Sequence, residues 1–308
     1  MNILITGSSG FIGKNLVKYF ELNQEINLTL LTTNRHIGSN NSNHKVVNFD
    51  DIDKIDYEDL LKNIDVIIHL ISKQHEARKK NKDYQKFYDI NVKISEKLAY
   101  QARKYKINHF LYFSTIKVFG EYSIANYKFN SQSNTHPTTN YSITKKLAEN
   151  VLKNIFTNSK TNLTIIRFPL VYGDRPKGNL YVLEKYLKLG LPLPFRKICN
   201  KRSLIHIKNL FDFTNLCIKS KKAYNKTFIV SDNLDLSSIE IIRGLIKKYK
   251  SKTLLINTPF LFFVKIYNKF FKKKIMINFY STLICSNLES KKIMNWNPKY
   301  DFNDYIKN

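Results

Sequence analysis

A tyrosine and a lysine four residues apart, Tyr141 and Lys145, are the first candidates for chemistry in this sequence. They lie in a segment with a helical pattern, and residues four apart share one face of a helix, so the ammonium would stand near the phenol. A neighbouring cation favours phenolate and so lowers the pKa of a tyrosine from its usual value of about 10. Such a tyrosine can pass a proton to or from a sugar or alcohol oxygen while a hydride moves on carbon.

A pair of hydroxyl residues makes this spacing more informative than it would be alone. With 19 Tyr and 51 Lys and Arg in the chain, a Tyr-x-x-x-Lys spacing will also occur by chance. However, Ser114-Thr115 ends a predicted strand, 26 residues before Tyr141. A hydroxyl at the carboxyl end of such a strand lies where ligands bind in α/β sheets. We therefore expect Thr115, Tyr141 and Lys145 to form one catalytic set.

A glycine-rich turn follows the first predicted strand, residues 3–5, and opens a helix. Its glycines have a GxxGxxG spacing, which suits a tight turn, a close approach to a pyrophosphate and close packing of helix on strand. The first N–H groups of the helix would then face the phosphates. The turn predicts a dinucleotide cofactor bound by Gly7, Gly10, Phe11, Ile12 and Gly13. The oxidised nicotinamide of such a cofactor, together with Lys145, is expected to bring the pKa of Tyr141 toward neutrality.

The residues after the second predicted strand bear on which dinucleotide is bound. An acid that would hold the adenosine ribose hydroxyls is missing there, and Arg35 follows instead. An Arg without an acid favours a 2′-phosphate, hence NADP(H), although Arg35 could equally be a solvated loop residue. Asp50 and Asp51 follow the third strand, where a carboxylate could contact the adenine amino group, and spacing alone does not decide between them. NAD(H) and NADP(H) therefore both remain candidates.

Strand and helix patterns alternate through the first half of the chain, which predicts an α/β fold with a Rossmann-type, doubly wound parallel sheet. We expect residues 1–170 to form the cofactor-binding domain, with part of 205–230 returning to it. Residues 171–308 should form mainly a smaller C-terminal substrate-binding lobe, in which Trp296 is expected to pack. The predicted strands are residues 3–5, 28–31, 46–47, 66–70, 110–113 and 163–168, and the predicted helices 14–22, 88–105 and 141–155.

The net charge of +27 first suggests a nucleic-acid or membrane partner. The excess of basic residues is nearly all Lys and is spread along the chain. Proteins that bind nucleic-acid phosphates usually do so with Arg, so we expect no nucleic-acid partner. The aromatic and basic stretch Phe260 to Lys274 could lie at a membrane surface. We favour a helix of the second lobe there and expect no stable membrane insertion. Three dispersed Cys fit no disulfide framework or zinc site, and with no targeting segment in view we expect a cytoplasmic protein without metal.

Taken together, these motifs resemble the NAD-dependent epimerase/dehydratase family, extended short-chain dehydrogenases/reductases that act mostly on nucleotide sugars. The resemblance covers nearly the whole chain and includes, besides the residues above, His69-Leu70, Asn91-Val92 and the stretches 114–120, 167–173, 202–207 and 295–298. It implies that Thr115 and Tyr141 act on the substrate and that Lys145 also holds the nicotinamide ribose. It further implies that Phe168, Pro169 and Leu170 lie beside the nicotinamide, and that Asn179, Leu180 and Arg202 bind the diphosphate part of a UDP-sugar. Members often form homodimers.

Three reactions of the family compete. Its 4,6-dehydratases typically carry Asp-Glu directly after the catalytic Thr, and Ile116-Lys117 stands there instead, which makes dehydration improbable. Finer resemblance favours a subgroup of UDP-N-acetylquinovosamine dehydrogenase-like 4-ketoreductases of bacterial surface-polysaccharide synthesis. We therefore predict NAD(P)H-dependent reduction of a UDP-4-keto-6-deoxy-N-acetylhexosamine at C4. A UDP-hexose or UDP-N-acetylhexosamine 4-epimerase with bound NAD is the alternative, and a non-catalytic NADP-binding regulator is a second one.

Overall fold

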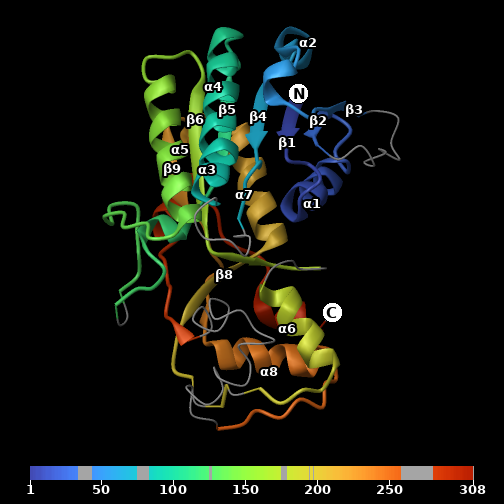
Figure 1. The fold of residues 1–308 in the computed structure, drawn as a ribbon, viewed down its shortest axis with the longest axis vertical. Coiled ribbons are helices and arrows are strands. Elements are labelled where there is room, and N and C mark those ends of the chain that lie inside the picture. Colours follow the sequence, from blue (N-terminus) through green and yellow to red (C-terminus); the bar gives the residue numbers. More distant parts are fainter. Residues whose placement is uncertain are drawn as a thin grey trace.

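A sheet of seven parallel strands forms the centre of the larger part of the molecule (Figure 1). The computed structural model describes residues 1–33, 44–74, 83–124, 127–174, 179–193, 195–196, 198–257 and 280–307. The strand order reverses between β1 and β4, which creates a crevice at their carboxyl ends. In spatial order the strands are β3 (Lys45–Asn48), β2 (Asn27–Thr32), β1 (Asn2–Thr6), β4 (Val66–His69), β5 (His109–Thr115), β6 (Asn162–Phe168) and β9 (Lys226–Ile229).

Helices cover both faces of this sheet because its strands carry apolar side chains on both faces. In β1, Ile3 and Ile5 face one core and Leu4 faces the other, and all three are fully buried. The first core is closed by α1 (Phe11–Phe20), α7 (Ile207–Lys219) and α11 (Leu288–Met294). The second face carries α2 (Tyr57–Leu61), α4 (Ile94–Lys104) and α5 (Asn140–Phe156), with α3 (Asp83–Tyr88) and a π-helical segment, Asp89–Lys93, packed against α5.

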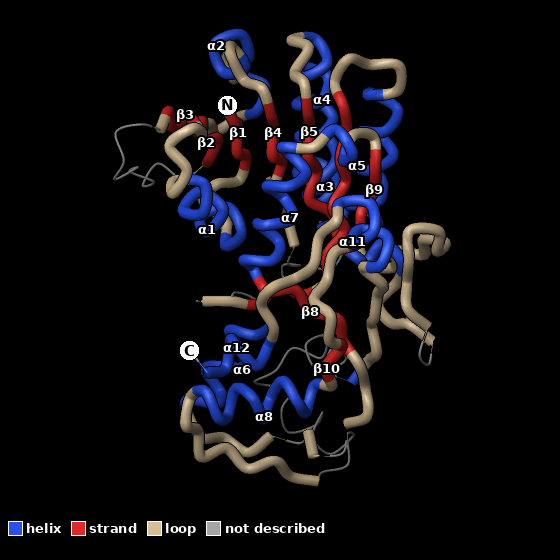
Figure 2. The backbone as a smooth tube through the Cα atoms, turned by 180° about the vertical axis from the view of Figure 1, so that it is seen from behind, coloured by secondary structure: helices blue, strands red, loops and turns tan. Residues whose placement is uncertain are grey.

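A smaller layer lies beyond the carboxyl ends of the large sheet (Figure 2). It contains a three-stranded sheet of β10 (Asp235–Leu236), β8 (Arg202–His206) and β7 (Leu170–Tyr172). Three helices, α6 (Asn179–Lys188), α8 (Ser238–Lys248) and α12 (Phe302–Lys307), share an apolar core with this sheet. The chain passes between the two layers several times, because α7, β9 and α11 return to the large sheet.

The predicted α/β class and the doubly wound parallel sheet are confirmed. The prediction for Trp296 is wrong, because its ring packs edge-on to Phe213 of α7 at 5.0 Å, in the core of the large sheet. Helix α11, just before Trp296, brings this segment back to that sheet. The stretch Phe260 to Lys274 lies outside the described residues.

The glycine turn between β1 and α1 has the tight packing that its spacing predicts. Gly7 adopts a φ of +70°, which favours glycine. A side chain at Gly13 would place its Cβ 2.4 Å from the carbonyl oxygen of Gly7 and 2.7 Å from Cα of Ser8. The helix can therefore start directly against the turn only if position 13 carries no side chain.

We expect Gly13→Ala to lower the free energy of unfolding by about 1–3 kcal/mol, because the added methyl must push the turn away from the helix. Denaturant unfolding followed by circular dichroism would measure this change. Ser9→Ala is the matched control in the same turn and should stay within about 0.5 kcal/mol of the natural chain. Equal stability of the two variants would contradict the packing described for Gly13.

Candidate active site

A cavity of about 780 Å³ opens at the carboxyl ends of β1, β2, β3 and β4. This is the switch point of the strand order, where ligands of open α/β sheets bind. The walls come from the glycine turn, from the ends of these strands and from the π-helical segment and α4. The lining residues are Gly7, Ser9, Gly10, Leu31, Thr32, Thr33, Phe49, Asp50, Asp51, Ile52, Asp53, Leu70, Ile71, Ser72, Asp89, Ile90, Lys93, Ile94 and Lys97.

The glycine-turn end of this cavity fits the pyrophosphate of a dinucleotide. Gly10 is the N-cap of α1, no side chain caps the helix, and its first turn contains no acid. The first amides of the helix, at Phe11 and Ile12, therefore remain for an anionic group, which the helix dipole also favours. Gly10 itself lines the cavity, and of the neighbouring atoms only the carbonyl oxygen of Gly7, at 3.3 Å, would crowd an added Cβ there.

The opposite end of the cavity carries both predicted adenine-contacting acids. Asp50 and Asp51 both line the wall, just after β3. The side chain of Asp51 accepts a hydrogen bond from the amide of Asp53 at 2.9 Å, which caps a short 3₁₀ turn. Arg35 lies outside the described residues.

The three predicted catalytic residues lie on two elements that meet beside this crevice. Thr115 is the last residue of β5, and Tyr141 and Lys145 lie on successive turns of α5. The capping residue of α5 is Thr139, whose hydroxyl accepts a hydrogen bond from the amide of Ser142. This cap starts the helix just before Tyr141 and so orients the phenol.

Burial dominates the proton affinity of Tyr141. It raises the pKa of the phenol to about 12, and a hydrogen bond with the Thr115 hydroxyl opposes this rise without cancelling it. The protein's own groups therefore keep the phenol protonated at neutral pH, and Lys145 by itself does not bring it toward neutrality. The predicted lowering requires a further positive charge, such as an oxidised nicotinamide.

The ammonium of Lys145 is almost completely buried and points toward the sheet. Its Nζ donates a hydrogen bond to the carbonyl oxygen of Phe113 at 2.5 Å and stands 3.8 Å from the centre of the Tyr112 ring. Burial lowers the pKa of Lys145 to about 7, while the negative charge of Glu149 raises it. The negative charge of Glu149 thus favours the protonated, cationic form of Lys145.

Glu149 also belongs to a buried ion pair that sequence reasoning missed. Its two carboxylate oxygens accept hydrogen bonds from Nε and Nη2 of Arg167 at 2.9 and 2.6 Å. The Ser114 hydroxyl donates a third hydrogen bond at 2.6 Å. The contact therefore joins α5, β6 and β5, each directly beside a predicted site residue. The i,i+4 spacing from Lys145 to Glu149 was the available signal.

Asn91 links the cavity wall to the catalytic helix. Its side-chain oxygen accepts a hydrogen bond from the amide of Lys73 at 2.7 Å, and its amide nitrogen donates to the hydroxyl of Thr144 at 2.9 Å. The segment after β4 and the helix that carries Lys145 are thereby held together. Asn91 belongs to the Asn91-Val92 pair of the family resemblance, and the sequence alone indicates no role for it.

The residues predicted to flank the nicotinamide and the substrate occupy the junction of the two layers. Phe168 ends β6, where its ring packs edge-on to Phe113, and Pro169 and Leu170 lead into β7. Arg202 is buried at the start of β8, where its Nη1 donates to the carbonyl oxygen of Ser281 at 3.0 Å. Burial lowers the pKa of Arg202 to about 10, so it stays a cation at neutral pH.

The remaining two predicted substrate residues begin α6. Leu180 is buried in the apolar core of the smaller layer, so its side chain is not available to a ligand. The predicted substrate contact could therefore come only from its backbone. The side chain of Asn179 lies outside the described part of the structure.

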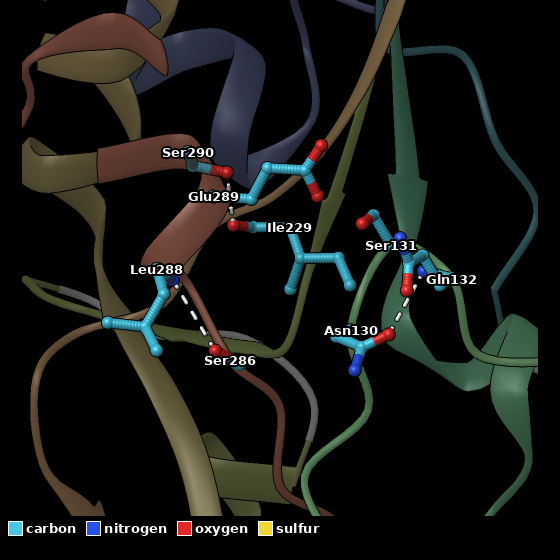
Figure 3. Close-up of a pocket in the computed structure, with 8 residues that line it drawn as sticks. All are labelled: Asn130, Ser131, Gln132, Ile229, Ser286, Leu288, Glu289 and Ser290. Atoms are coloured by element: carbon cyan, nitrogen blue, oxygen red, sulfur yellow. Dashed lines mark hydrogen bonds between the residues drawn. The ribbon is translucent and has the colours of Figure 1, made fainter. Parts of the chain in front are cut away.

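A second, smaller cavity of about 270 Å³ lies at the edge of the large sheet, between the loop after β5 and α11 (Figure 3). None of the predicted site residues lines it. Within the described ranges, no group of three His, Cys, Asp or Glu side chains is arranged to hold a metal ion. The helices of those same ranges also lack the combined length and apolar character needed to cross a bilayer.

We expect Arg167→Met to cost about 3 kcal/mol of unfolding free energy, because it removes both guanidinium hydrogen bonds and leaves the buried Glu149 carboxylate only the more distant ammonium of Lys146, at 3.8 Å. The double variant Glu149→Leu/Arg167→Met should recover most of this loss. Chemical denaturation of the natural chain and the two variants would measure both effects. A single variant that loses less than about 1 kcal/mol would show that the pair does not hold the three elements together.

Comparisons with known proteins agree with this architecture. The sequence profile of the NAD dependent epimerase/dehydratase family matches residues 3–230. Over 301 residues the chain is 33% identical to a UDP-glucose 4-epimerase of Vibrio cholerae, an alignment that covers 96% of this chain and 90% of that protein. It is 22% identical over 265 residues to the N-acetyl-alpha-D-glucosaminyl-diphospho-ditrans,octacis-undecaprenol 4-epimerase of Escherichia coli O157:H7, covering 84% and 76% of the two chains.

The fold also matches solved structures over the full length of the chain. The UDP-glucuronic acid 4-epimerase of Bacillus cereus, solved with UDP-glucuronic acid and NAD, superposes with a TM-score of 0.81 at 21% identity, covering 100% of this chain and 97% of that one. The UDP-glucose 4-epimerase of Thermotoga maritima, solved with UDP-glucose, gives a TM-score of 0.81 at 18% identity, covering 100% and 96%. These two likenesses show the shared fold, while the sequence matches show the relationship. The chain therefore belongs to the NAD dependent epimerase/dehydratase family.

Proposed function

We propose that this protein catalyses hydride transfer at C4 of a UDP-linked hexose, with a nicotinamide dinucleotide as cofactor. The observation that carries the proposal is the placement of Thr115, at the end of β5, beside Tyr141 and the buried Lys145, which lie on successive turns of α5. Family membership supports the same chemistry, and full-length relatives are named as nucleotide-sugar enzymes.

Each residue of the set has a defined task in this proposal. Tyr141 donates its proton to the oxygen that forms at C4, and the Thr115 hydroxyl hydrogen-bonds the same oxygen. Lys145 holds the nicotinamide ribose and adds positive charge near the phenol. The bound nicotinamide supplies the hydride. Because the protein alone keeps Tyr141 protonated, the residue is ready to act as an acid.

Arg202 holds the diphosphate of the substrate in this proposal, together with Asn179. A guanidinium presents several donors in a fixed plane, which suits phosphate oxygens. Arg202 is a buried cation at the start of β8, in the layer that faces the carboxyl ends of the large sheet. The substrate would then span from this layer to Tyr141.

We infer that NAD(H) is the preferred cofactor. The end of β2, at Thr32 and Thr33, shares its cavity with the carboxylates of Asp50 and Asp51. Carboxylates in that cavity would repel the 2′-phosphate of NADP(H) and tolerate the hydroxyls of NAD(H). Solved relatives contain NAD, which supports the same preference.

The reaction that we propose is reduction of a UDP-4-keto-6-deoxy-N-acetylhexosamine at C4, in the synthesis of bacterial surface polysaccharide. Dehydration needs an acid and a base beside the catalytic Thr, and this chain places Ile116 and Lys117 there. Ile116 is buried, and the ammonium of Lys117 is paired with Glu121. Neither side chain can serve as a carboxylate acid or base.

A 4-epimerase with tightly bound NAD is the second candidate. The observation that favours it is the 33% identity, over nearly the whole chain, to the Vibrio cholerae protein named UDP-glucose 4-epimerase. An epimerase would use the same three residues to take and return the proton of the C4 hydroxyl, while a bound NAD would accept and return the C4 hydride of the same sugar. The two candidates differ in whether reduced cofactor is consumed.

Incubation with UDP-4-keto-6-deoxy-N-acetylglucosamine and NADH should oxidise NADH, measured by the loss of absorbance at about 340 nm. UDP-N-acetylglucosamine and UDP-glucose without added cofactor should stay unchanged, measured by nuclear magnetic resonance of the sugars. Conversion of either sugar without NADH oxidation would identify an epimerase. Absence of turnover with every sugar would instead support a non-catalytic cofactor-binding regulator.

Tyr141→Phe should lower kcat by at least about 100-fold, because it removes the proton donor and leaves the aromatic ring in place. Binding of NADH, measured by fluorescence, should remain. Tyr100→Phe on the exposed face of α4 is the matched control and should keep full turnover. A Tyr141→Phe variant with near-normal kcat would disprove the assigned role.

A further inference from the structure

A segment near the C-terminus, residues 281–286, lies between two elements of the site, the start of β8 and the loop after β5. On one side, Leu283 pairs in parallel with Arg202. On the other side, the carbonyl oxygens of Thr282 and Ile284 accept hydrogen bonds from amides of the loop after β5 at 2.8 and 3.0 Å. The segment therefore connects Arg202, to which the proposed function assigns the diphosphate, with the loop beyond the catalytic strand.

Ser281, the first residue of this segment, holds the buried guanidinium of Arg202 by two contacts. Nη1 of Arg202 donates to the carbonyl oxygen of Ser281 at 3.0 Å and to its hydroxyl oxygen at 3.1 Å. Because Nη1 carries two N–H groups, the one residue can accept from both. The guanidinium is planar and rigid, so two acceptors on one nitrogen also restrict the plane in which the other two nitrogens lie.

The position of Ser281 is itself fixed by Asn200, a buried residue just before β8. Nδ2 of Asn200 donates to the carbonyl oxygen of Ser281 at 2.9 Å. The side-chain oxygen of Asn200 accepts a hydrogen bond from the amide of Ser238, at the start of α8, at 2.9 Å. The carbonyl contact to Arg202 is therefore anchored through the backbone, and the Ser281 hydroxyl is the part of the arrangement that a side-chain change can remove.

We propose that Ser281 is a positioning residue for the substrate diphosphate, which acts through Arg202 by holding its guanidinium in the orientation that contacts the phosphates. The inference rests on the proposed role of Arg202 in binding the diphosphate of a UDP-sugar. An arginine that is already held in place loses less side-chain freedom when its ligand binds. The Ser281 hydroxyl is neutral, so it contributes orientation and not charge.

Ser281→Ala should weaken the binding of UDP by about threefold to tenfold, because it removes one of the two acceptors of Nη1. Isothermal titration calorimetry of the full chain with NADH bound would measure this change without requiring turnover. In the reaction, KM for the UDP-sugar should rise by a similar factor while kcat stays within about twofold, since Tyr141 is untouched. Ser281→Thr keeps a hydroxyl and should keep the affinity for UDP.

Ser286→Ala, at the other end of the same segment, is the matched control. The hydroxyl of Ser286 accepts a hydrogen bond from the amide of Leu288 at 3.4 Å, beside the smaller cavity (Figure 3). This variant loses the same single oxygen atom as Ser281→Ala and should bind UDP as the natural chain does.

A double-mutant cycle separates the orientation of Arg202 from a general effect on the fold. Arg202→Met should itself weaken UDP binding by at least about tenfold, because it removes a charged partner of the diphosphate. In that background Ser281→Ala should cause no further loss, because no guanidinium remains to be oriented. A purely structural role of Ser281 would lower the affinity for UDP by the same factor in both backgrounds.

The outcomes separate this inference from the proposed function. A loss in Ser281→Ala that disappears in the Arg202→Met background supports the inference. Unchanged or tighter UDP binding in Ser281→Ala, with weaker binding in Arg202→Met, overturns the inference and leaves the proposed function standing, and so does an equal loss in both backgrounds. If Arg202→Met binds UDP as the natural chain does, the proposed role of Arg202 is wrong and the inference fails with it.

Thermal unfolding of each variant identifies any that do not fold. Ser281→Cys then replaces Ser281→Ala, because a thiol is only a weak acceptor, and Arg202→Gln replaces Arg202→Met, because it also lacks the guanidinium. The expected results and those that overturn the inference stay the same for these replacements.

Discussion

The geometry of the site depends on one buried contact, the ion pair of Glu149 with Arg167. Two charges in an apolar interior are stable only while each has its partner and its remaining hydrogen bonds. Glu149 satisfies this condition with Arg167 and Ser114, which come from two neighbouring strands. Any slip of α5 against these strands would leave a charge without its partner.

Each member of this contact is placed close to a residue of the proposed site. Ser114 precedes Thr115, Arg167 precedes Phe168, and Glu149 lies one turn after Lys145. The contact thus fixes the relative positions of the hydroxyl, the ammonium and the aromatic wall. It also supplies the negative charge that supports a cation at Lys145, although burial there lowers its pKa to about 7.

The fold could be predicted from the sequence because it follows from local patterns. Strand runs, helical periodicity and the glycine spacing are each visible within about ten residues, and they agree with one another. The same patterns placed Thr115 and Tyr141 on a strand end and a helix start, which is where the structure has them.

What could not be predicted depends on long-range contacts. Trp296 packs on the large sheet because α11 returns to it, and nothing near Trp296 in the sequence indicates that return. The proton affinity of Tyr141 follows from how deeply it is buried, which spacing does not report. The burial of Leu180 in the core of the smaller layer likewise depends on contacts that spacing does not report. The role of Glu149 also needs the position of a partner 18 residues away in the chain.

The net charge of +27 can be compared with the charges that line the cavity. The cavity wall carries Asp50, Asp51, Asp53 and Asp89, of which Asp53 and Asp89 pair with Lys97 and Lys93. The positive charge is therefore not concentrated in the cavity. The cations that bear on the proposed chemistry are few, namely Lys145 and Arg202, and both are buried.

In the proposed reaction, a hydride reaches C4 of the sugar while Tyr141 protonates the oxygen. The most direct test is to supply NADH deuterated at C4 of the nicotinamide ring, as each of the two stereoisomers, with the UDP-4-keto-6-deoxy sugar, and to locate deuterium in the product by nuclear magnetic resonance. We expect one deuterium at C4 of the sugar from one of the two isomers, formed at least about 100-fold more slowly with Tyr141→Phe. A reduced product without deuterium at C4 from either isomer would contradict it.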